Sequence, residues 1–124
     1  MPIGNARLLH TQQLHYFRKR VNYNDPGIAA GVQFGTLPAG AMLALLNVRV
    51  NTAFNGTGPA LNVGTTALGT QIFTDAATAG ARSPTIPNLA FAVDTDLYVS
   101  SVATGAPTTG QADILIGFAP NNDQ

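Results

Sequence analysis

The sequence feature that most constrains the fold is a sustained alternation of apolar and polar residues in the middle of the chain. From Met42 to Phe54 the even positions are almost all apolar, while the odd positions turn polar at Asn47, Arg49 and Asn51. Successive side chains of a β-strand point to opposite faces, so this period of two predicts one long strand. A strand with one apolar and one polar face belongs in an antiparallel sheet that is exposed on one side.

Shorter segments of the same type and the turns between them predict the rest of the fold. Strands are expected at 28–34, 89–93, 97–104 and 112–118, with weaker signals at 61–64 and 71–74. Turns rich in Gly, Pro and Asn separate them at 24–27, 37–40, 55–59 and 105–110. Seven or eight short strands in one domain predict an all-β fold, an antiparallel β-sandwich or barrel. The Ala-rich segment 75–81 allows at most a short helix, because Gly80 and Pro84 end it.

The apolar positions of these segments form the expected core. We expect these side chains to be buried: Val32, Phe34, Leu46, Val48, Val50, Phe54, Phe91, Val93, Val99, Ile114, Ile116 and Phe118. Each side chain of this size stabilises the folded state by roughly 1.5 to 3 kcal/mol when it is buried. Leu43 and Leu45 fall on the opposite face of the long strand, which makes them candidates for contact with another subunit.

The surface of the chain is short of charge. Only 10% of the 124 residues are charged and the net charge is zero, whereas about 25% of the residues of an average soluble domain are charged. Like-charge repulsion normally keeps domains apart, so this composition favours a surface that neighbouring molecules cover. The alternative is an ordinary, weakly charged monomer.

The cations are concentrated near the beginning of the sequence, at Arg7, Arg18, Lys19 and Arg20. We therefore divide the chain into a basic N-terminal arm with the first strand (1–24), a β-sandwich body (25–119) and a C-terminal tail (120–124). Segment 6–20 fits helical as well as strand spacing, and we favour an extended arm that leads into a strand. Such an arm suits an acidic protein surface, another copy of the chain or a nucleic acid.

Nucleic acid is the least favoured of these partners, because three consecutive cations in a strand cannot all face one way.

No constellation of residues supports catalysis, metal binding or a cofactor. The sequence lacks Cys and Glu entirely, and no Ser lies in a Gly-x-Ser-x-Gly motif. Asp94 and Asp96 would share one face of a strand, but a calcium site needs six or more oxygen ligands, so we interpret them as polar residues at a turn. We therefore expect no enzymatic activity. The longest near-apolar stretch, 39–46, is too short to cross a membrane, and the first residues do not match a secretion signal.

Three runs of sequence resemble small virion proteins of tailed bacteriophages, in particular capsid decoration (cement) proteins. The runs are 34–41 (FGTLPAGA), 48–56 (VRVNTAFNG) and the segment from Leu97-Tyr98-Val99 to Gly110-Gln111-Ala112-Asp113-Ile114-Leu115-Ile116. The resemblance implies a jelly-roll-like sandwich that stabilises a capsid shell by bridging its subunits. It further implies that the major capsid protein and other copies of the chain are the partners, without a cofactor. The location implied is the capsid surface of the virion, after assembly in the host cytoplasm.

Two other functions remain open at this point. A head-to-tail connector or tail component could share this style of sequence. A carbohydrate-binding sandwich would need exposed aromatic residues, whereas this chain has no Trp and three scattered Tyr. For the cement role, residues 1–20 would act as an arm on a neighbouring subunit, with Arg7, Arg18, Lys19 and Arg20 as its charged contacts.

Overall fold

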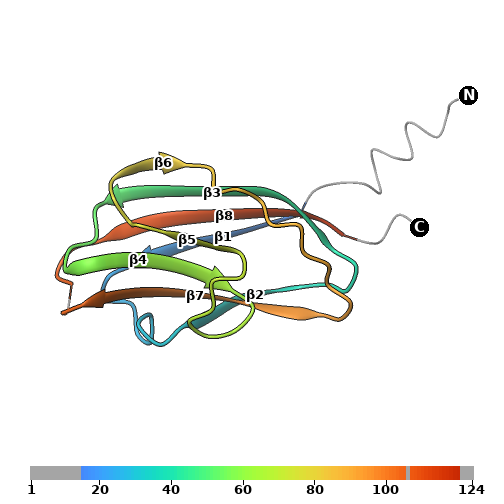
Figure 1. Cartoon of the computed structure of the whole chain (residues 1–124), viewed down its shortest axis with the longest axis horizontal. Helices are drawn as coiled ribbons and strands as arrows, with labels where there is room; N and C mark the ends of the chain where they lie inside the picture. The colour runs from blue at the N-terminus through green and yellow to red at the C-terminus, as the bar shows by residue number, and fades with distance from the viewer. Residues whose placement is uncertain (1–14, 106, 121–124) are drawn as a thin grey trace, which may run out of the picture.

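The structure is a computed structural model that describes residues 15–105 and 107–120. Eight strands in these residues form two four-stranded antiparallel sheets packed face to face (Figure 1). The strands are β1 (His15–Asn22), β2 (Val32–Leu37), β3 (Met42–Thr52), β4 (Thr57–Gly64), β5 (Phe73–Asp75), β6 (Gly80–Arg82), β7 (Thr95–Thr104) and β8 (Gln111–Ala119). The predicted all-β sandwich is confirmed.

The order of the strands makes this sandwich a jelly roll. Sheet A has the order β1-β8-β3-β6 and sheet B the order β2-β7-β4-β5. Every connection except the one from β4 to β5 therefore crosses from one sheet to the other, as in two interlocked Greek keys. The first and last strands lie side by side in sheet A (Figure 1), so residues at opposite ends of the sequence share one surface.

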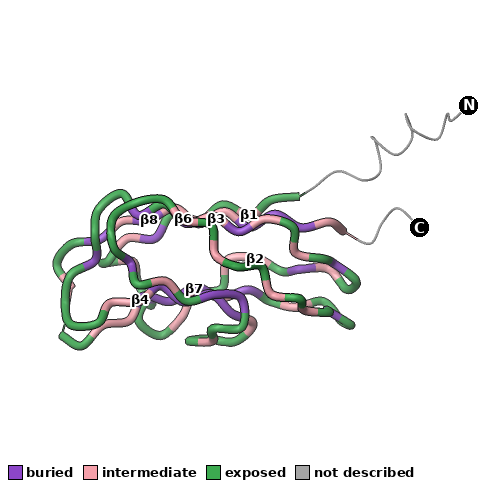
Figure 2. Tube along the Cα trace, turned by 45° about the horizontal axis from the view of Figure 1, so that its top comes forward, coloured by how far each residue is buried: buried purple, intermediate pink, exposed green. Residues whose placement is uncertain are grey.

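The core lies between the two sheets, and Figure 2 shows buried residues along strands of both sheets. These side chains of the expected core are buried: Leu46, Val48, Val50, Phe54, Phe91, Val99, Ile114, Ile116 and Phe118. Val32 and Phe34 are half-buried and pack against them. The remaining expected member, Val93, is 69% exposed, so its assignment to the core was wrong.

Val93 is exposed because its segment does not form the strand expected at 89–93. Residues 83–94 contain no strand, and the loop is held by bonds to the turn before β3. The Gly40 N–H donates to the carbonyl of Phe91 (2.7 Å), and the Ala39 N–H donates to Asp94 Oδ1 (2.9 Å). These two bonds tie the chain to the end of the sandwich before it enters β7, and Val93 points into solvent.

Two further expectations need correction in their bounds. The strand expected at 28–34 begins only at Val32, because the N–H groups of Ile28 and Ala30 bond to Asp25 and Gly27 in consecutive turns. Segment 75–81, which could have formed a short helix, instead links the three-residue strands β5 and β6. Residues 15–105 and 107–120 contain no helix long and apolar enough to span a membrane.

The long central strand β3 contains an irregularity that the alternation did not predict. The register with β8 shifts between Leu43 and Leu45, which leaves Ala44 as an extra residue. A β-bulge of this kind reverses the faces on either side of it. Leu43 consequently packs against the core and Met42 is 67% exposed, whereas Leu46, Val48 and Val50 are buried as expected.

Candidate interaction surface

The surface of sheet A that faces away from the core is built from three cross-strand rows. Residues directly opposite each other in antiparallel strands point to the same side of the sheet. On β8, Ile114, Ile116 and Phe118 point into the core, so the alternate residues of β8 and their partners on β1 and β3 point outward. The rows run from β1 through β8 to β3: Tyr16, Gly117 and Leu45; Arg18, Leu115 and Asn47; Arg20, Asp113 and Arg49. We call these three rows the sheet A outer face.

The first row gives this face an apolar end. A side chain added at Gly117 would place its Cβ 3.0 Å from both Cε1 of Tyr16 and Cβ of Leu45. Glycine at this position therefore lets the Tyr16 ring and Leu45 close over β8. Tyr16 nevertheless remains 55% exposed, so an apolar surface is available to a partner.

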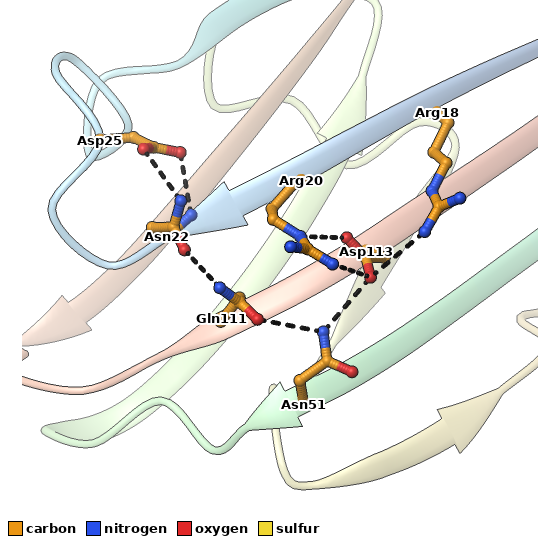
Figure 3. A network of polar contacts seen from close by, with 7 residues as sticks. All are labelled: Arg18, Arg20, Asn22, Asp25, Asn51, Gln111 and Asp113. Atoms are coloured by element: carbon orange, nitrogen blue, oxygen red, sulfur yellow. Dashed lines mark hydrogen bonds and ion pairs between the residues drawn. The ribbon is translucent and has the colours of Figure 1, made fainter.

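The third row centres on an ion pair (Figure 3). Asp113 accepts hydrogen bonds from Arg20 Nε (2.8 Å), Arg20 Nη2 (3.1 Å) and Asn51 Nδ2 (3.3 Å), and Arg18 Nη2 lies 3.7 Å from its Oδ2. The hydrogen bonds from Arg20, helped by the bond from Asn51 and the positive charges of both arginines, lower the pKa of Asp113 to about 2. Asp113 is therefore ionised at neutral pH and holds both arginines on the outside of the sheet.

Amide side chains extend this network to the end of β1 (Figure 3). Gln111 accepts from Asn51 Nδ2 (3.4 Å) and donates to Asn22 Oδ1 (3.1 Å). The backbone N–H of Asn22 in turn donates to Asp25 Oδ2 (2.9 Å). Side chains of β1, β8 and β3 are thus fixed to one another across the sheet, and a fixed surface loses less conformational entropy when it binds a partner.

A shallow depression of about 520 Å³ lies on the outer side of sheet A, between β8, β3 and β6. Its charged and polar lining consists of Arg18, Asn47, Arg49, Arg82, Ser83 and Asp113. Arg49 forms no salt bridge within the described residues, although its register partner is Asp113. The depression therefore presents a guanidinium group that is free to bind a carboxylate.

The charges of the described residues are divided unequally between the sheets. All five cations lie on sheet A, at Arg18, Lys19, Arg20, Arg49 and Arg82. Sheet B has no cation in its strands and carries two carboxylates, Asp75 and Asp96. Although the sequence has no net charge, the folded protein therefore carries an excess of positive charge on sheet A.

Arg82 and Asp75 link the two sheets at their open edge. Arg82 Nε lies 2.7 Å from Asp75 Oδ2, and Arg82 Nη2 lies 2.7 Å from Asp75 Oδ1. Since β6 is the last strand of sheet A and β5 the last strand of sheet B, this bidentate pair joins both layers. The hydrogen bonds from Arg82 lower the pKa of Asp75.

The structure brings some of the predicted contact residues together and separates others. Arg18, Arg20 and Leu45 share the sheet A outer face. Lys19 is opposite Ile114 and points to the core side at the sheet edge. The placement of Leu43 on the outer face was wrong, because the bulge at Ala44 turns it toward the core.

Arg7 lies outside the described residues, and the contact role of all these residues remains a prediction.

Several residues of this face were not predicted from the sequence. Tyr16, Arg49, Asp113 and Leu115 were not selected, although the alternation of β3 already placed Arg49 on the polar side. Asp113 and Arg20 are 93 residues apart, so only the pairing of β1 with β8 could reveal their contact.

Asp94 and Asp96, the two carboxylates considered for calcium, are engaged with the protein itself. Asp94 accepts from the Ala39 N–H, and Asp96 accepts from Thr36 Oγ1 (3.0 Å). In the part of the chain that the structure describes, no three His, Cys, Asp or Glu side chains are grouped so that they could hold a metal ion.

The fold is shared with chains of three phage capsid structures. A chain in the capsid asymmetric unit of cyanophage Pam1 aligns with 89% of this chain and 86% of its own length, with a TM-score of 0.65 and 18% identity. A chain in the acid-stable capsid of Helicobacter pylori bacteriophage KHP30 aligns over 87% of this chain and 89% of its own, with a TM-score of 0.65 and 11% identity. A chain in the capsid of Ralstonia phage GP4 aligns with 90% of this chain and 86% of its own length, with a TM-score of 0.60 and 19% identity.

No protein-family model and no curated protein matches the sequence. The similarity is therefore one of fold, and it extends over nearly the whole length of both chains in each comparison.

Proposed function

We propose that this protein is a structural component of a bacteriophage capsid. The observation that carries the proposal is the fold likeness to chains of three phage capsids, which extends over 87–90% of this chain. Fold alone does not define function, so the proposal also depends on the chemistry of the surface. We assign the protein no catalytic activity.

Within this role we propose that the protein is a decoration (cement) protein on the capsid surface. Its partners would be the major capsid protein and neighbouring copies of itself. A cement protein bridges several subunits at once, so weak single contacts combine into tight binding. The sheet A outer face supports this role, because its polar side chains are fixed by Asp113 and the amide network before any partner binds.

The test is to locate and count the protein in purified particles. We expect many copies arranged with the symmetry of the shell, measured by quantitative mass spectrometry and by electron cryomicroscopy of the particle. Shells assembled without the protein should bind added protein to saturation and disassemble at a higher temperature afterwards. A single ring of copies at one vertex would instead indicate a head-to-tail connector, and absence from the particle would refute the virion role.

A further inference from the structure

Strand β1 forms a long and regular outer edge of sheet A. It pairs with β8 over all eight of its residues and, within residues 15–105 and 107–120, with no strand on its other side. The other three sheet edges are short or interrupted, because β5 and β6 have three residues each and the pairing of β2 shifts between Gln33 and Gly35. Short and irregular strands protect an edge from other extended chains, and β1 lacks this protection.

Hydrogen bonds at the end of β1 show which backbone groups face the open side. The Tyr23 N–H donates to the Gly110 carbonyl (3.0 Å), next to β8, whereas the Asn22 N–H donates to Asp25 Oδ2 (2.9 Å) in the turn that follows β1. The N–H and C=O of one strand residue point to the same side, and this side alternates along the strand. Since β1 has no register shift, the backbone groups of its even-numbered residues point away from β8.

Three of these residues present unpaired backbone groups. The turn uses both groups of Asn22, because the Asp25 N–H donates to the Asn22 carbonyl (3.1 Å). Tyr16, Arg18 and Arg20 remain, and their N–H and C=O groups have no backbone partner among the described residues. We call the backbone groups and side chains of these three residues the β1 edge.

The β1 edge carries an excess of positive charge. Arg20 donates two hydrogen bonds to Asp113, whereas Arg18 lies 3.7 Å from this carboxylate and its side chain is 70% exposed (Figure 3). Lys19 forms no salt bridge within the part of the chain that the structure describes. Arg18 can therefore turn to a second carboxylate without breaking the pair of Arg20 and Asp113.

A second copy of β1 is a poor partner for this edge. The two longest antiparallel registers that keep the sheet A outer face continuous place Arg18 opposite itself, or Lys19 opposite itself with Arg18 opposite Arg20. Like charges that lie directly opposite in a sheet are destabilising. The charge of the edge thus favours an acidic partner over self-pairing.

We propose that the β1 edge binds an extended acidic segment of another protein, which adds to sheet A as a strand antiparallel to β1. Its backbone would exchange hydrogen bonds with Tyr16, Arg18 and Arg20, in the pattern that every pair of this sheet already follows. Carboxylates on its outward side would stand about 5 Å from Arg18 and Arg20, measured between Cβ atoms. The backbone bonds supply affinity and the alternate side chains supply specificity.

The inference rests on the proposed function and deepens it, because the acidic segment would belong to a subunit of the shell. It states the chemistry of that segment: carboxylates at alternate positions, followed by an apolar residue opposite Tyr16, whose side chain is 55% exposed.

A synthetic peptide tests the edge on the purified full-length protein. The probe is acetyl-Thr-Asp-Val-Asp-Val-Val-Thr-amide, whose two Asp residues would lie opposite Arg20 and Arg18. In a ¹⁵N NMR titration at low salt, the amide signals of Tyr16, Arg18 and Arg20 should shift to saturation and exchange more slowly with solvent. The amides of Phe17 and Lys19 already face β8 and should change less. A titration without saturable shifts at these positions would overturn the proposal.

N-methylated peptides test for strand addition itself. Methylation of the second Asp nitrogen removes a bond to the backbone of Arg18 and should weaken binding by about tenfold or more. Methylation of the Val nitrogen just before it is the matched control, because this N–H would point away from β1, and it should change the affinity by less than about threefold. Equal affinities of the two methylated peptides would show that the peptide does not pair with the edge.

A charge swap tests the contact at Arg18. Arg18→Glu should weaken binding of the probe by about fivefold or more, and a peptide with Lys in place of the second Asp should bind R18E within about twofold of the original pair. Arg49→Glu is the matched control: it makes the same charge change on the same face, but β8 separates it from β1, so the affinity should fall less than about twofold. Circular dichroism should show that both variants are folded. An equal loss in R18E and R49E would overturn the assignment to the β1 edge.

The outcome is separable from the proposed function. Particles that carry the protein although it ignores the peptide would refute the β1 edge alone. A protein that binds the peptide as described but is absent from particles would refute the virion role alone.

Discussion

Asp113 is the single residue on which the charge arrangement of the sheet A outer face depends. Its pKa in the folded protein is lowered to about 2 from an ordinary value of 3.8. A lowered pKa means that the ionised carboxylate stabilises the folded state above about pH 4, and that this contribution is lost as the pH falls toward 2. Water screens the pair, since the Arg20 side chain is 56% exposed.

We therefore predict that Asp113→Asn lowers the free energy of unfolding at pH 7 by about 1 kcal/mol or less. Between pH 4 and pH 2, the free energy of unfolding of this variant should fall less than that of the natural protein. Urea unfolding at pH 7, 4 and 2.5 measures both effects. Asp96→Asn is the control, because Asp96 bonds to a threonine hydroxyl rather than to an arginine. If D113N and D96N show the same pH profile as each other, the ion pair does not contribute.

A second residue-scale prediction concerns the Arg82–Asp75 pair. The Asp75 side chain is only 8% exposed, so removing its cation leaves a nearly buried carboxylate with one remaining bond, from the Ala77 N–H. Arg82→Gln should lower the free energy of unfolding by about 2 kcal/mol. Arg49→Gln is a matched control on the same sheet and should change it by less than about 0.5 kcal/mol. Equal effects of the two variants in chemical denaturation would contradict a structural role for the pair.

At the scale of elements, β1 is joined to sheet B by one aromatic side chain. The Phe17 ring stacks on Phe118 (centroids 5.3 Å apart) and meets Phe34 of β2 edge to face (6.2 Å). Gly35 makes this contact possible, because a Cβ there would lie 2.8 Å from Cε1 of Phe17. Any larger residue at position 35 of β2 would therefore collide with the Phe17 ring.

This arrangement predicts that Phe17→Ala and Gly35→Ala are coupled. F17A should cost about 2 kcal/mol through lost packing, and G35A about 1 to 2 kcal/mol through overpacking. The double variant should lose at least about 0.5 kcal/mol less than the sum, because the new methyl group enters the space that the ring leaves. Tyr16→Ala, on the solvent side of the same strand, should cost less than about 1 kcal/mol. Simple additivity in thermal and urea unfolding would mean that the ring does not press on Gly35.

The elements that the sequence predicted well are those with regular alternation and clear turns. The segments around β3, β7 and β8 were identified because each buries one face over many residues. β6, with three residues, is too short to show a period, and the apolar run 89–93 has strand composition without a partner strand. The bulge at Ala44 also leaves no signal, because the residues on both sides of it are apolar.

At the scale of the whole molecule, the sequence could predict a sandwich but only part of its interaction surface. The sheet A outer face combines the first and last strands, so Arg20 meets Asp113 across 93 residues of sequence. Pairing at such distance follows from the jelly-roll order, which no local pattern encodes. The separation of cations onto sheet A likewise appears only when the strands are assigned to sheets.

The strand order also changes how the N-terminal arm must be tested. The arm was expected to span residues 1–20, but β1 begins at His15, so Arg18, Lys19 and Arg20 belong to the sandwich itself. Deleting residues 1–22 would uncover the edge of β8 and remove Val21, a fully buried core residue. That deletion should therefore abolish cooperative unfolding, and a loss of particle binding in this variant would say nothing about an arm.

Deletion of residues 1–14 separates the contact role of the arm from the structural role of β1, since it keeps every residue of β1. We predict that this variant unfolds with the same midpoint as the full chain and binds shells at least tenfold more weakly, because it lacks Arg7 and the rest of the proposed arm. Arg7→Gln in the full chain should weaken binding in the same direction but less, since it leaves the backbone of the arm in place. Full occupancy of shells by the 1–14 deletion would refute the arm and would mean that residues 15–124 are sufficient for contact with the shell.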